Sequence, residues 1–230
     1  MHTFYVDNQN LDAEEARHAF RVLRLRPGDE VTALQSGQRY LAKIAQLDDK
    51  SGRVELLEEL PSNESPLRLT VYQGLPKAEK LEFLAQKLTE LGASRLVPVR
   101  MERSVAKAEG GKRQDRLTRI AREAVKQCRR ATPMEIAEPM AWKEALKDMT
   151  ERQLMIVPWE NAEASRMADI RVAHPEIRDM GILIGPEGGI SQAEIDAAPA
   201  IPVLLGPRIL RAETAAVTAA ALAMTLWGDI

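Results

Sequence analysis

Cysteine, histidine and aromatic residues are scarce in this chain of 230 residues. A single Cys excludes an internal disulfide and a cysteine metal cluster, and three scattered His give no pattern of metal ligands. Aromatic residues make up only 4% of the chain, which argues against an aromatic platform for stacking nucleic-acid bases. The sequence therefore predicts no metal site.

Long apolar runs are also missing. The N-terminus, Met1–Phe4, lacks the basic and apolar regions of a secretory signal, and the apolar stretch Ala215–Trp227 is too short to span a bilayer. With 45% hydrophobic and 29% charged residues, the composition is typical of a globular protein that buries a full core. We expect a cytoplasmic protein with no membrane partner.

The net charge of −2 argues weakly against a nucleic-acid partner, but the charge is unevenly spread. Four Arg lie within Arg17–Arg26, and Arg100–Arg130 holds eleven Lys or Arg against four acidic residues. A basic face on a nearly neutral protein fits a partner that carries phosphates. Taken alone, each cluster favours a solvated helix surface over a binding face.

The sequence pattern over residues 1–66 predicts a separate small domain. Its short strands are expected at Asp29–Leu34, Arg39–Leu47 and Arg53–Leu57, after a helical pattern that begins near Asp12 and carries Ala16, Ala19, Phe20 and Leu23. Closely spaced short strands favour a small barrel, and Pro61–Pro66 reads as a linker.

From Leu67 onward, short apolar runs alternate with helical patterns. Strands are expected at Leu69–Gln73, Leu96–Val99, Leu154–Val157, Ile182–Ile184 and Val203–Leu205, and helices at Lys77–Leu91, Arg113–Arg130, near Ala164, behind Ser191 and at Glu213–Leu226. Gly92 is placed to end the first of these helices, and Ser191 with Glu194 forms a capping box. Repeated β-helix-β units predict a parallel sheet covered by helices, in a second domain over residues 67–230.

Two of these strands stop at Gly-Pro. One continues as Gly185–Gly189 and the other as Gly206–Glu213. Loops rich in glycine let a ligand lie against bare backbone, because no Cβ holds it away. Each loop alone is more often a plain turn, but two together, with Arg211 and Glu213 beside the second, favour a ligand site.

The loops also exclude two common ligand classes. The chain lacks the Walker pattern of an NTPase, and Gly185–Gly189 is not the G-x-G-x-x-G of a dinucleotide dehydrogenase. Glu187 would repel a pyrophosphate. An acid in the loop suits a ligand with positive charge and hydrogen-bond donors, and S-adenosylmethionine has both.

A polar stripe follows the helix predicted at Arg113–Arg130, made of Arg116, Arg119, Glu123, Gln127 and Arg130. It fits a phosphate-bearing partner, and it fits equally well a set of solvent-exposed pairs at i, i+4 such as Arg119 with Glu123.

The segments Ile184–Gly189 and Leu205–Ala215 resemble the 16S rRNA uracil-N3-methyltransferase family, the RsmE family, of the SPOUT class of methyltransferases. The paired glycine loops in this order are its specific signal. The likeness continues at His18 with Val22–Arg24, Lys77–Lys80, Lys87–Gly92, Arg103–Val105, and Glu123 with Gln127 and Arg130.

This resemblance implies an α/β fold for the second domain, a SPOUT-type parallel sheet with a deep C-terminal trefoil knot. It implies that the N-terminal domain is a PUA-like β-barrel that helps to hold RNA. The protein would be a homodimer that uses S-adenosylmethionine to methylate N3 of one uridine of 16S rRNA, presented by the assembled small ribosomal subunit.

The resemblance also places the site. S-adenosylmethionine would be held by Glu160, Ile184, Gly185, Pro186, Glu187, Gly188, Gly189, Leu205, Gly206, Ile209 and Leu210. The RNA would be gripped by Arg24, Lys80, Lys87, Arg103, Gln127 and Arg130. We hypothesise that Arg211 stabilises the negative charge on the uracil, and that Glu213, or a water that it orients, accepts the N3 proton.

Alternatives stay open for both catalytic residues and for the function. Arg211 fits a phosphate contact as well, and Glu213 fits an acid stabilised at a helix N-terminus. A SPOUT enzyme that methylates the ribose 2′-hydroxyl would share the cofactor site. A non-catalytic RNA-binding or ribosome-assembly factor on the same fold would bind RNA without S-adenosylmethionine.

Overall fold

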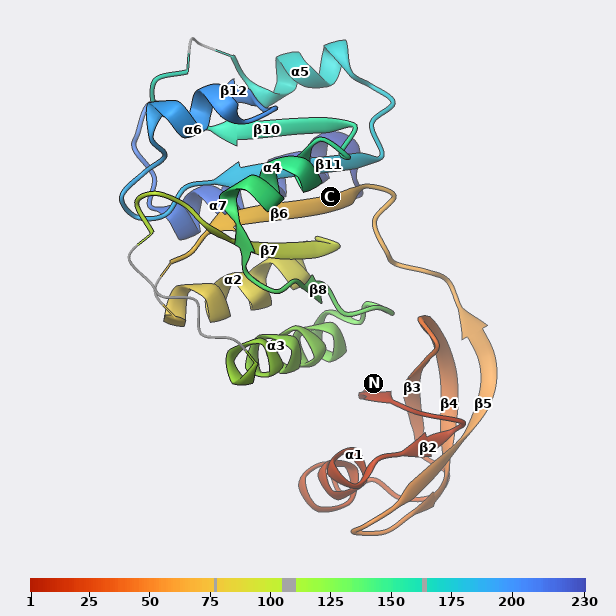
Figure 1. Cartoon of the computed structure of the whole chain (residues 1–230). Coiled ribbons are helices and arrows are strands. Elements are labelled where there is room, and N and C mark those ends of the chain that lie inside the picture. The colour runs from red at the N-terminus through yellow and green to blue at the C-terminus, as the bar shows by residue number, and fades with distance from the viewer. Residues whose placement is uncertain (77, 105–110, 163–164) are drawn as a thin grey trace. The chain divides into compact units, whose positions relative to one another are not determined.

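The computed structural model describes residues 1–76, 78–104, 111–162 and 165–230 (Figure 1). The chain forms two compact units. The first contains Met1–Glu64 together with Val125–Thr132, and the second contains Ser65–Ala124 and Pro133–Ile230.

One curled sheet makes up most of the first unit, with its strands in the order β1-β3-β4-β5-β2 (Figure 1). The pair β1 and β3 is parallel and the other pairs are antiparallel. Register shifts between β4 and β5 at Leu41/Ala42 and at Ile44/Gln46 bend the strands. This half-barrel confirms the small β-domain predicted from the short strands. The strands are β1 Thr3–Tyr5, β2 Asn10–Leu11, β3 Glu30–Gln35, β4 Gln38–Leu47 and β5 Gly52–Leu60.

The helical segment of this unit has two parts. The α-helix α1, Ala13–Arg17, begins where the side chain of Asp12 accepts a hydrogen bond from the backbone N–H of Glu15, and it continues as the π-helical turn η1, His18–Val22. Ala19 is fully buried, but Phe20 is 45% exposed. The wider turn rotates Phe20 away from the apolar face on which a regular α-helix would place it.

Seven parallel strands form the sheet of the second unit, which confirms the predicted parallel α/β fold. Their order is β12-β10-β11-β6-β7-β8, and β9 also pairs with β7. Strand β12 ends at Val203, so Leu204 and Leu205, which the apolar run placed in the strand, belong to the loop behind it. The strands are β6 Arg68–Gly74, β7 Arg95–Arg100, β8 Glu135–Ile136, β9 Met140–Ala141, β10 Leu154–Pro158, β11 Asp179–Ile184 and β12 Ile201–Val203.

Helices cover both faces of this sheet (Figure 1). Alternate strand residues face opposite ways: Ile182 packs in one cluster with side chains of α2, α3, α5 and α7, and Leu183 in another with those of α4 and α6. The helices are α2 Ala78–Glu90, α3 Lys112–Cys128, α4 Trp142–Met149, α5 Met167–Ala173, α6 Gln192–Ala197 and α7 Ala212–Trp227. Ala164, near which a helix was predicted, and Lys77 lie outside the described residues. Within the described ranges, no helix is long and apolar enough to cross a bilayer.

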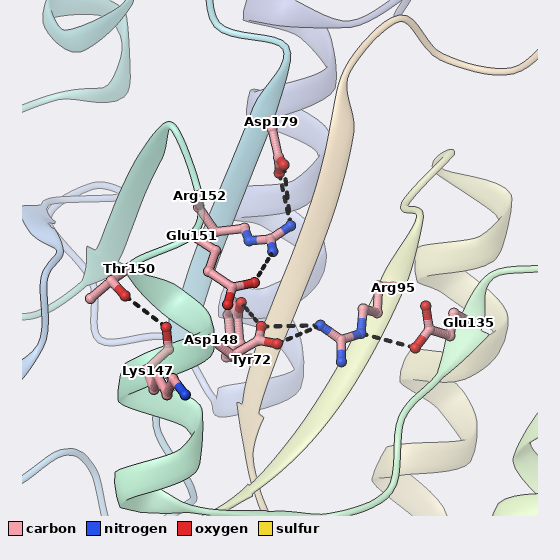
Figure 2. A network of polar contacts seen from close by, with 9 residues as sticks. All are labelled: Tyr72, Arg95, Glu135, Lys147, Asp148, Thr150, Glu151, Arg152 and Asp179. Carbon is pink, nitrogen blue, oxygen red and sulfur yellow. Dashed lines mark hydrogen bonds and ion pairs between the residues drawn. The ribbon is translucent and has the colours of Figure 1, made fainter.

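Charged side chains are matched at the amino ends of the parallel strands (Figure 2). Arg95, the first residue of β7, donates to both carboxylate oxygens of Asp148 at 3.0 Å and to Glu135 at 3.0 Å. Tyr72, which is fully buried, donates its hydroxyl proton to the same Asp148. Burial opposes the charged form of Asp148, but the hydrogen bonds from Tyr72 and Arg95 outweigh it and lower the pKa of this carboxyl.

A second cation completes this amino edge (Figure 2). Arg152 donates to both oxygens of Asp179, the first residue of β11, at 3.2 Å, and lies 3.5 Å from Glu151. Thr150 closes the end of α4 by donating to the carbonyl of Lys147 at 2.7 Å. Each of these charges has a partner of opposite sign, which is the arrangement that a structural network requires.

Candidate functional site

The opposite edge of the sheet carries the predicted loops. Because the strands are parallel, β6, β10, β11 and β12 all end there, at Gly74, Pro158, Ile184 and Val203. Strand β10 pairs with both β11 and β12, so the loop that starts at Trp159 lies between the two glycine loops. Ligands of open α/β sheets bind at this carboxyl edge.

A pocket of about 140 Å³ opens between the loops that follow β10 and β12. Its walls are largely apolar and it also exposes backbone at Gly206, whose φ of +140° suits glycine. Five residues predicted to hold a cofactor line it, namely Glu160, Leu205, Gly206, Ile209 and Leu210. Its other lining residues are Pro158, Trp159, Leu204, Pro207, Arg208 and Ala215.

The loop Gly185–Gly189 packs tightly against neighbouring backbone. A Cβ on Gly74, at the end of β6, would lie 2.5 Å from Cδ of Pro186 and 2.6 Å from its backbone nitrogen. Gln73, which is fully buried, donates from Nε2 to the carbonyl of Gly185 at 3.1 Å and to that of Gly74 at 2.9 Å. Glycine at position 74 and the Gln73 amide therefore fix where this loop leaves the sheet.

Residues behind β7 hold the far side of the same loop. Arg103 donates to the carbonyl of Gly188 at 3.2 Å, and a Cβ on Gly188 would lie 2.9 Å from Cβ of Arg103. The buried carboxylate of Glu194 accepts from the backbone N–H of Glu102 at 2.9 Å and from that of Ser191 at 3.1 Å. Glu194 thereby confirms the capping box at the start of α6 and ties it to the segment that carries Arg103.

Lys80, in the first turn of α2, joins two acids of the candidate site. Its Nζ lies 2.9 Å from Glu213, in the first turn of α7, and 3.2 Å from Glu187 in the first glycine loop. Glu187, which was expected to face a positively charged ligand, therefore has the ammonium group of Lys80 beside it. One cation bridges two carboxylates here, and the charge of Arg211 also acts on Glu213.

The cation sets the protonation of its partners. Burial opposes the charged form of Glu213, but the hydrogen bond from Lys80 outweighs it, and the pKa of this carboxyl lies below its usual value. The hydrogen bond to Glu213 is also the main reason that the pKa of Lys80 is raised, helped by Glu187. Both groups are therefore charged at neutral pH. Arg211, the residue that caps α7, is exposed beside them along the chain.

The residues predicted to bind RNA differ in their surroundings. Arg24 and Gln127 are exposed, and Lys87 pairs with Glu90 of the same helix at 2.9 Å. Arg130 is buried in the first unit, where it donates to Glu64 at 2.7 Å, and Glu64 also accepts from the backbone of Ala131. For Lys80, Arg103 and Arg130, the geometry adds a contact inside the protein that sequence reasoning did not anticipate.

Sequence reasoning did not identify four contributors to the site, namely Gln73, Gly74, Leu204 and Glu194. Glu194 was predicted only as part of the capping box. Gly74 had a local signal, since a glycine at the end of an apolar strand often marks a close backbone approach. The contacts of Gln73 and Glu194 join segments far apart in the chain and leave no local pattern.

Comparisons with known proteins agree with this architecture. The family model described as "RNA methyltransferase domain" matches residues 63–224, and the one described as "RNA methyltransferase PUA domain" matches residues 11–57. The ribosomal RNA small subunit methyltransferase E of Bacillus subtilis is 31% identical over 90% of this chain and 85% of its own length. Its namesake from Aquifex aeolicus is 31% identical over 97% of this chain and 99% of its own.

A solved structure carries the same fold. The ribosomal RNA small subunit methyltransferase E of Neisseria gonorrhoeae, bound to S-adenosyl methionine, superposes with a TM-score of 0.90 at 33% identity, over 100% of this chain and 99% of that one. The match extends over both units, so the resemblance seen in the glycine loops holds for the whole chain. The chain belongs to the ribosomal RNA small subunit methyltransferase E family.

Proposed function

We propose that this protein transfers a methyl group from S-adenosylmethionine to N3 of a uridine in 16S rRNA. The observation that carries the proposal is the carboxyl edge of the sheet, where the pocket at Leu204–Leu210 adjoins the start of α7 with Arg211 and the Glu213–Lys80 pair. The names of the relatives from Bacillus subtilis and Aquifex aeolicus support the rRNA substrate.

The residues at this edge fit the cofactor. Apolar side chains and glycine backbone line the pocket, which suits an adenosine group that needs aliphatic contact and backbone hydrogen bonds. At about 140 Å³ the pocket is smaller than S-adenosylmethionine, so we assign part of the cofactor to the adjoining loop Gly185–Gly189. The Neisseria gonorrhoeae relative is bound to the same cofactor. When bound, this group supplies a methyl already activated by its positive sulfur.

The chain's own residues then have two tasks. Aligning two bound reactants contributes up to roughly 7–11 kcal/mol, and we assign that alignment to the loops. As the methyl bonds to N3, the N3 proton must leave, and negative charge spreads to the flanking carbonyl oxygens. We assign stabilisation of this charge to Arg211 and acceptance of the proton to Glu213, directly or through a water. The lowered pKa of Glu213 keeps it deprotonated at neutral pH, and the same shift makes the carboxylate a weaker base.

For the RNA itself we retain the six residues that the resemblance implies, with different tasks. Arg24, Lys87 and Gln127 are assigned direct contacts with the RNA backbone. Lys80, Arg103 and Arg130 are assigned a supporting role, because each joins segments far apart in the chain, through Glu213, Gly188 and Glu64 respectively, whereas Lys87 pairs within its own helix. The first unit is proposed to serve as the RNA-binding domain of residues 1–66, and the second as the methyltransferase domain of residues 67–230.

The remaining parts of the proposal concern topology and setting. We propose a trefoil knot in the second domain. The order of the sheet supports it, because the chain leaves the edge strand β12 and returns to pack α7 against β6, β11 and α2. We further propose a homodimer that acts in the cytoplasm on the assembled small subunit.

One experiment tests the activity. Small subunits lacking the modification are incubated with the protein and S-adenosylmethionine, and the rRNA nucleosides are analysed by mass spectrometry. We expect 3-methyluridine. A 2′-O-methylated nucleoside would establish the ribose-methylating alternative, and the absence of a new nucleoside, with no calorimetric signal for cofactor binding, would establish the non-catalytic RNA-binding protein.

A further inference from the structure

The π-helical turn of the first unit presents apolar side chains to solvent. Phe20 is 45% exposed and Val22 is 68% exposed, while Ala19 between them and the helix α1 is fully buried. π turns are rare and occur most often at functional sites. This turn keeps a small residue inside and leaves the side chains of Phe20 and Val22 partly open to solvent.

The backbone that follows the π-helical turn adopts an unfavourable conformation at Arg24. The N–H of Leu25 donates to the carbonyl of Ala19 at 3.0 Å, which closes the helix end, and Arg24 takes the left-handed conformation with φ of +55°. Glycine normally occupies this position, because a Cβ disfavours the conformation. Arg24 is one of five non-glycine residues with positive φ in the described part of the chain, and such a conformation at an exposed arginine motivates a functional hypothesis.

Basic side chains flank the exposed apolar residues. Arg17, His18, Arg21 and Arg24 are all exposed in this segment, and Asp49 pairs with Arg21 and also interacts electrostatically with Arg17. Neither Arg17 nor Arg24 forms an ion pair within the described part of the chain. An exposed aromatic ring among cations fits a strand of unpaired nucleotides, whose bases stack on the ring while its phosphates meet the arginines.

We propose that Phe20 and Val22 form a base-contacting surface for single-stranded RNA, with Arg17 and Arg24 holding the adjacent phosphates. The proposal rests on the rRNA methyltransferase function and adds a specific contact for its substrate. It adds a single stacking residue to a chain whose low aromatic content argues against an aromatic platform.

Leu57 offers a matched control within the same unit. It is also 45% exposed, on strand β5, but its exposed neighbours are Glu55, Glu58 and Glu59. Any general effect of trimming a half-exposed apolar side chain appears in Leu57→Ala as well as in Phe20→Ala. A contact with RNA appears in Phe20→Ala alone.

The test uses the full chain and two fluorescent probes, a ten-nucleotide RNA of mixed sequence and an abasic strand of the same length and charge. Phe20→Ala should weaken binding of the RNA by about 5- to 100-fold and leave binding of the abasic strand unchanged, since stacking needs bases. Phe20→Trp should bind the RNA at least as well as the wild type. Arg24→Ala should weaken both probes, and Leu57→Ala neither.

Three results would overturn the proposal: unchanged RNA binding by Phe20→Ala, an equal loss for both probes, or the same loss in Leu57→Ala. Circular dichroism of each variant checks that the fold is intact. Methylation of unmodified small subunits by the wild type is measured in parallel. If that reaction fails, the proposed function fails, whereas an unaltered affinity in Phe20→Ala sinks only the assignment of Phe20.

Discussion

The two edges of the parallel sheet use charged residues in opposite ways. At the amino edge, Arg95 donates two hydrogen bonds to Asp148, and Arg152 donates two to Asp179 (Figure 2). The Tyr72 hydroxyl donates one more to Asp148. At the carboxyl edge, Lys80 serves two acids at once and Arg211 is exposed. Charges held by direct pairwise hydrogen bonds suit a structural role, and a cation shared by two acids beside a pocket suits chemistry.

The carboxyl edge also contains close backbone contacts at two glycines. At the carboxyl edge, Gly74 and Gly188 let neighbouring atoms approach to distances that a Cβ would block. These contacts fix the loops without using side chains that a ligand needs. The comparison implies that substitutions at the carboxyl edge change activity more than stability, and that those at the amino edge do the reverse.

The largest effect is expected from Arg211→Ala. If Arg211 stabilises the charge on the uracil, its removal should lower the methylation rate of bound substrate by about 10²- to 10³-fold. The exposed side chain contributes little to stability, so the Tm should stay unchanged. Single-turnover kinetics on unmodified small subunits measure the rate.

Arg178→Ala is the matched control, since Arg178 is exposed just ahead of β11 at the amino edge. It should leave the rate unchanged. A rate for Arg211→Ala within threefold of the wild type would remove Arg211 from the catalytic step.

A smaller loss is expected from Lys80→Met. This change removes both ion pairs and leaves Glu187 and Glu213 to repel each other, which should displace the glycine loop and the start of α7. Since small misplacements of reactants are costly, we expect kcat/KM to fall by about 10- to 100-fold. The control is Lys143→Met, which removes an exposed lysine from α4. Equal rates in the two variants would show that Lys80 positions nothing.

The next effect belongs to the amino edge and concerns stability. Asp148→Ala leaves the Tyr72 hydroxyl and Arg95 without their shared acceptor, which should cost about 1–2 kcal/mol once partial exposure is allowed for. For a chain of this length that corresponds to a fall in Tm of about 2–8 °C, measured by calorimetry. Cofactor affinity should not change. Glu135→Ala is the control, because the Glu135 side chain is 64% exposed and its pair with Arg95 is worth under about 0.5 kcal/mol.

The contribution of Asp148 to the free energy of unfolding also depends on pH. The folded-state pKa of Asp148 lies below its unfolded value of about 3.9, so its stabilisation is complete above that value and is lost as pH falls through the folded pKa. The difference in Tm between the wild type and Asp148→Ala should therefore be constant near neutral pH and should shrink in acid. A difference that grew in acid would contradict the assignment.

The same contrast explains what the sequence could predict. The glycine loops, the apolar strands and the capping box at Ser191 are local patterns, and they were sufficient for the parallel sheet and for one side of the pocket. The amino-edge network joins Tyr72 to Asp148, 76 residues apart, so no local pattern reports it. The same holds for Lys80, whose two acids come from a distant loop and from the first turn of a distant helix. For Phe20 the period was misleading, because a π turn changes which residues share a face.

The smallest expected effect is a shift in the pH profile of Lys80→Met, which tests the proton acceptor at the carboxyl edge. In the wild type, Lys80 holds the pKa of Glu213 below its usual value against the opposing effect of burial. Without that cation, burial is opposed only by weaker contributions, so the pKa of Glu213 should rise. If Glu213 accepts the N3 proton, the acid limb of kcat/KM must move to higher pH in the variant, with little change in shape above neutral pH. Rates measured from pH 5 to pH 8 test this, and Lys80→Arg, which keeps the charge, should restore the limb. A limb at the same pH in all three proteins would mean that another group, or the solvent, takes the proton.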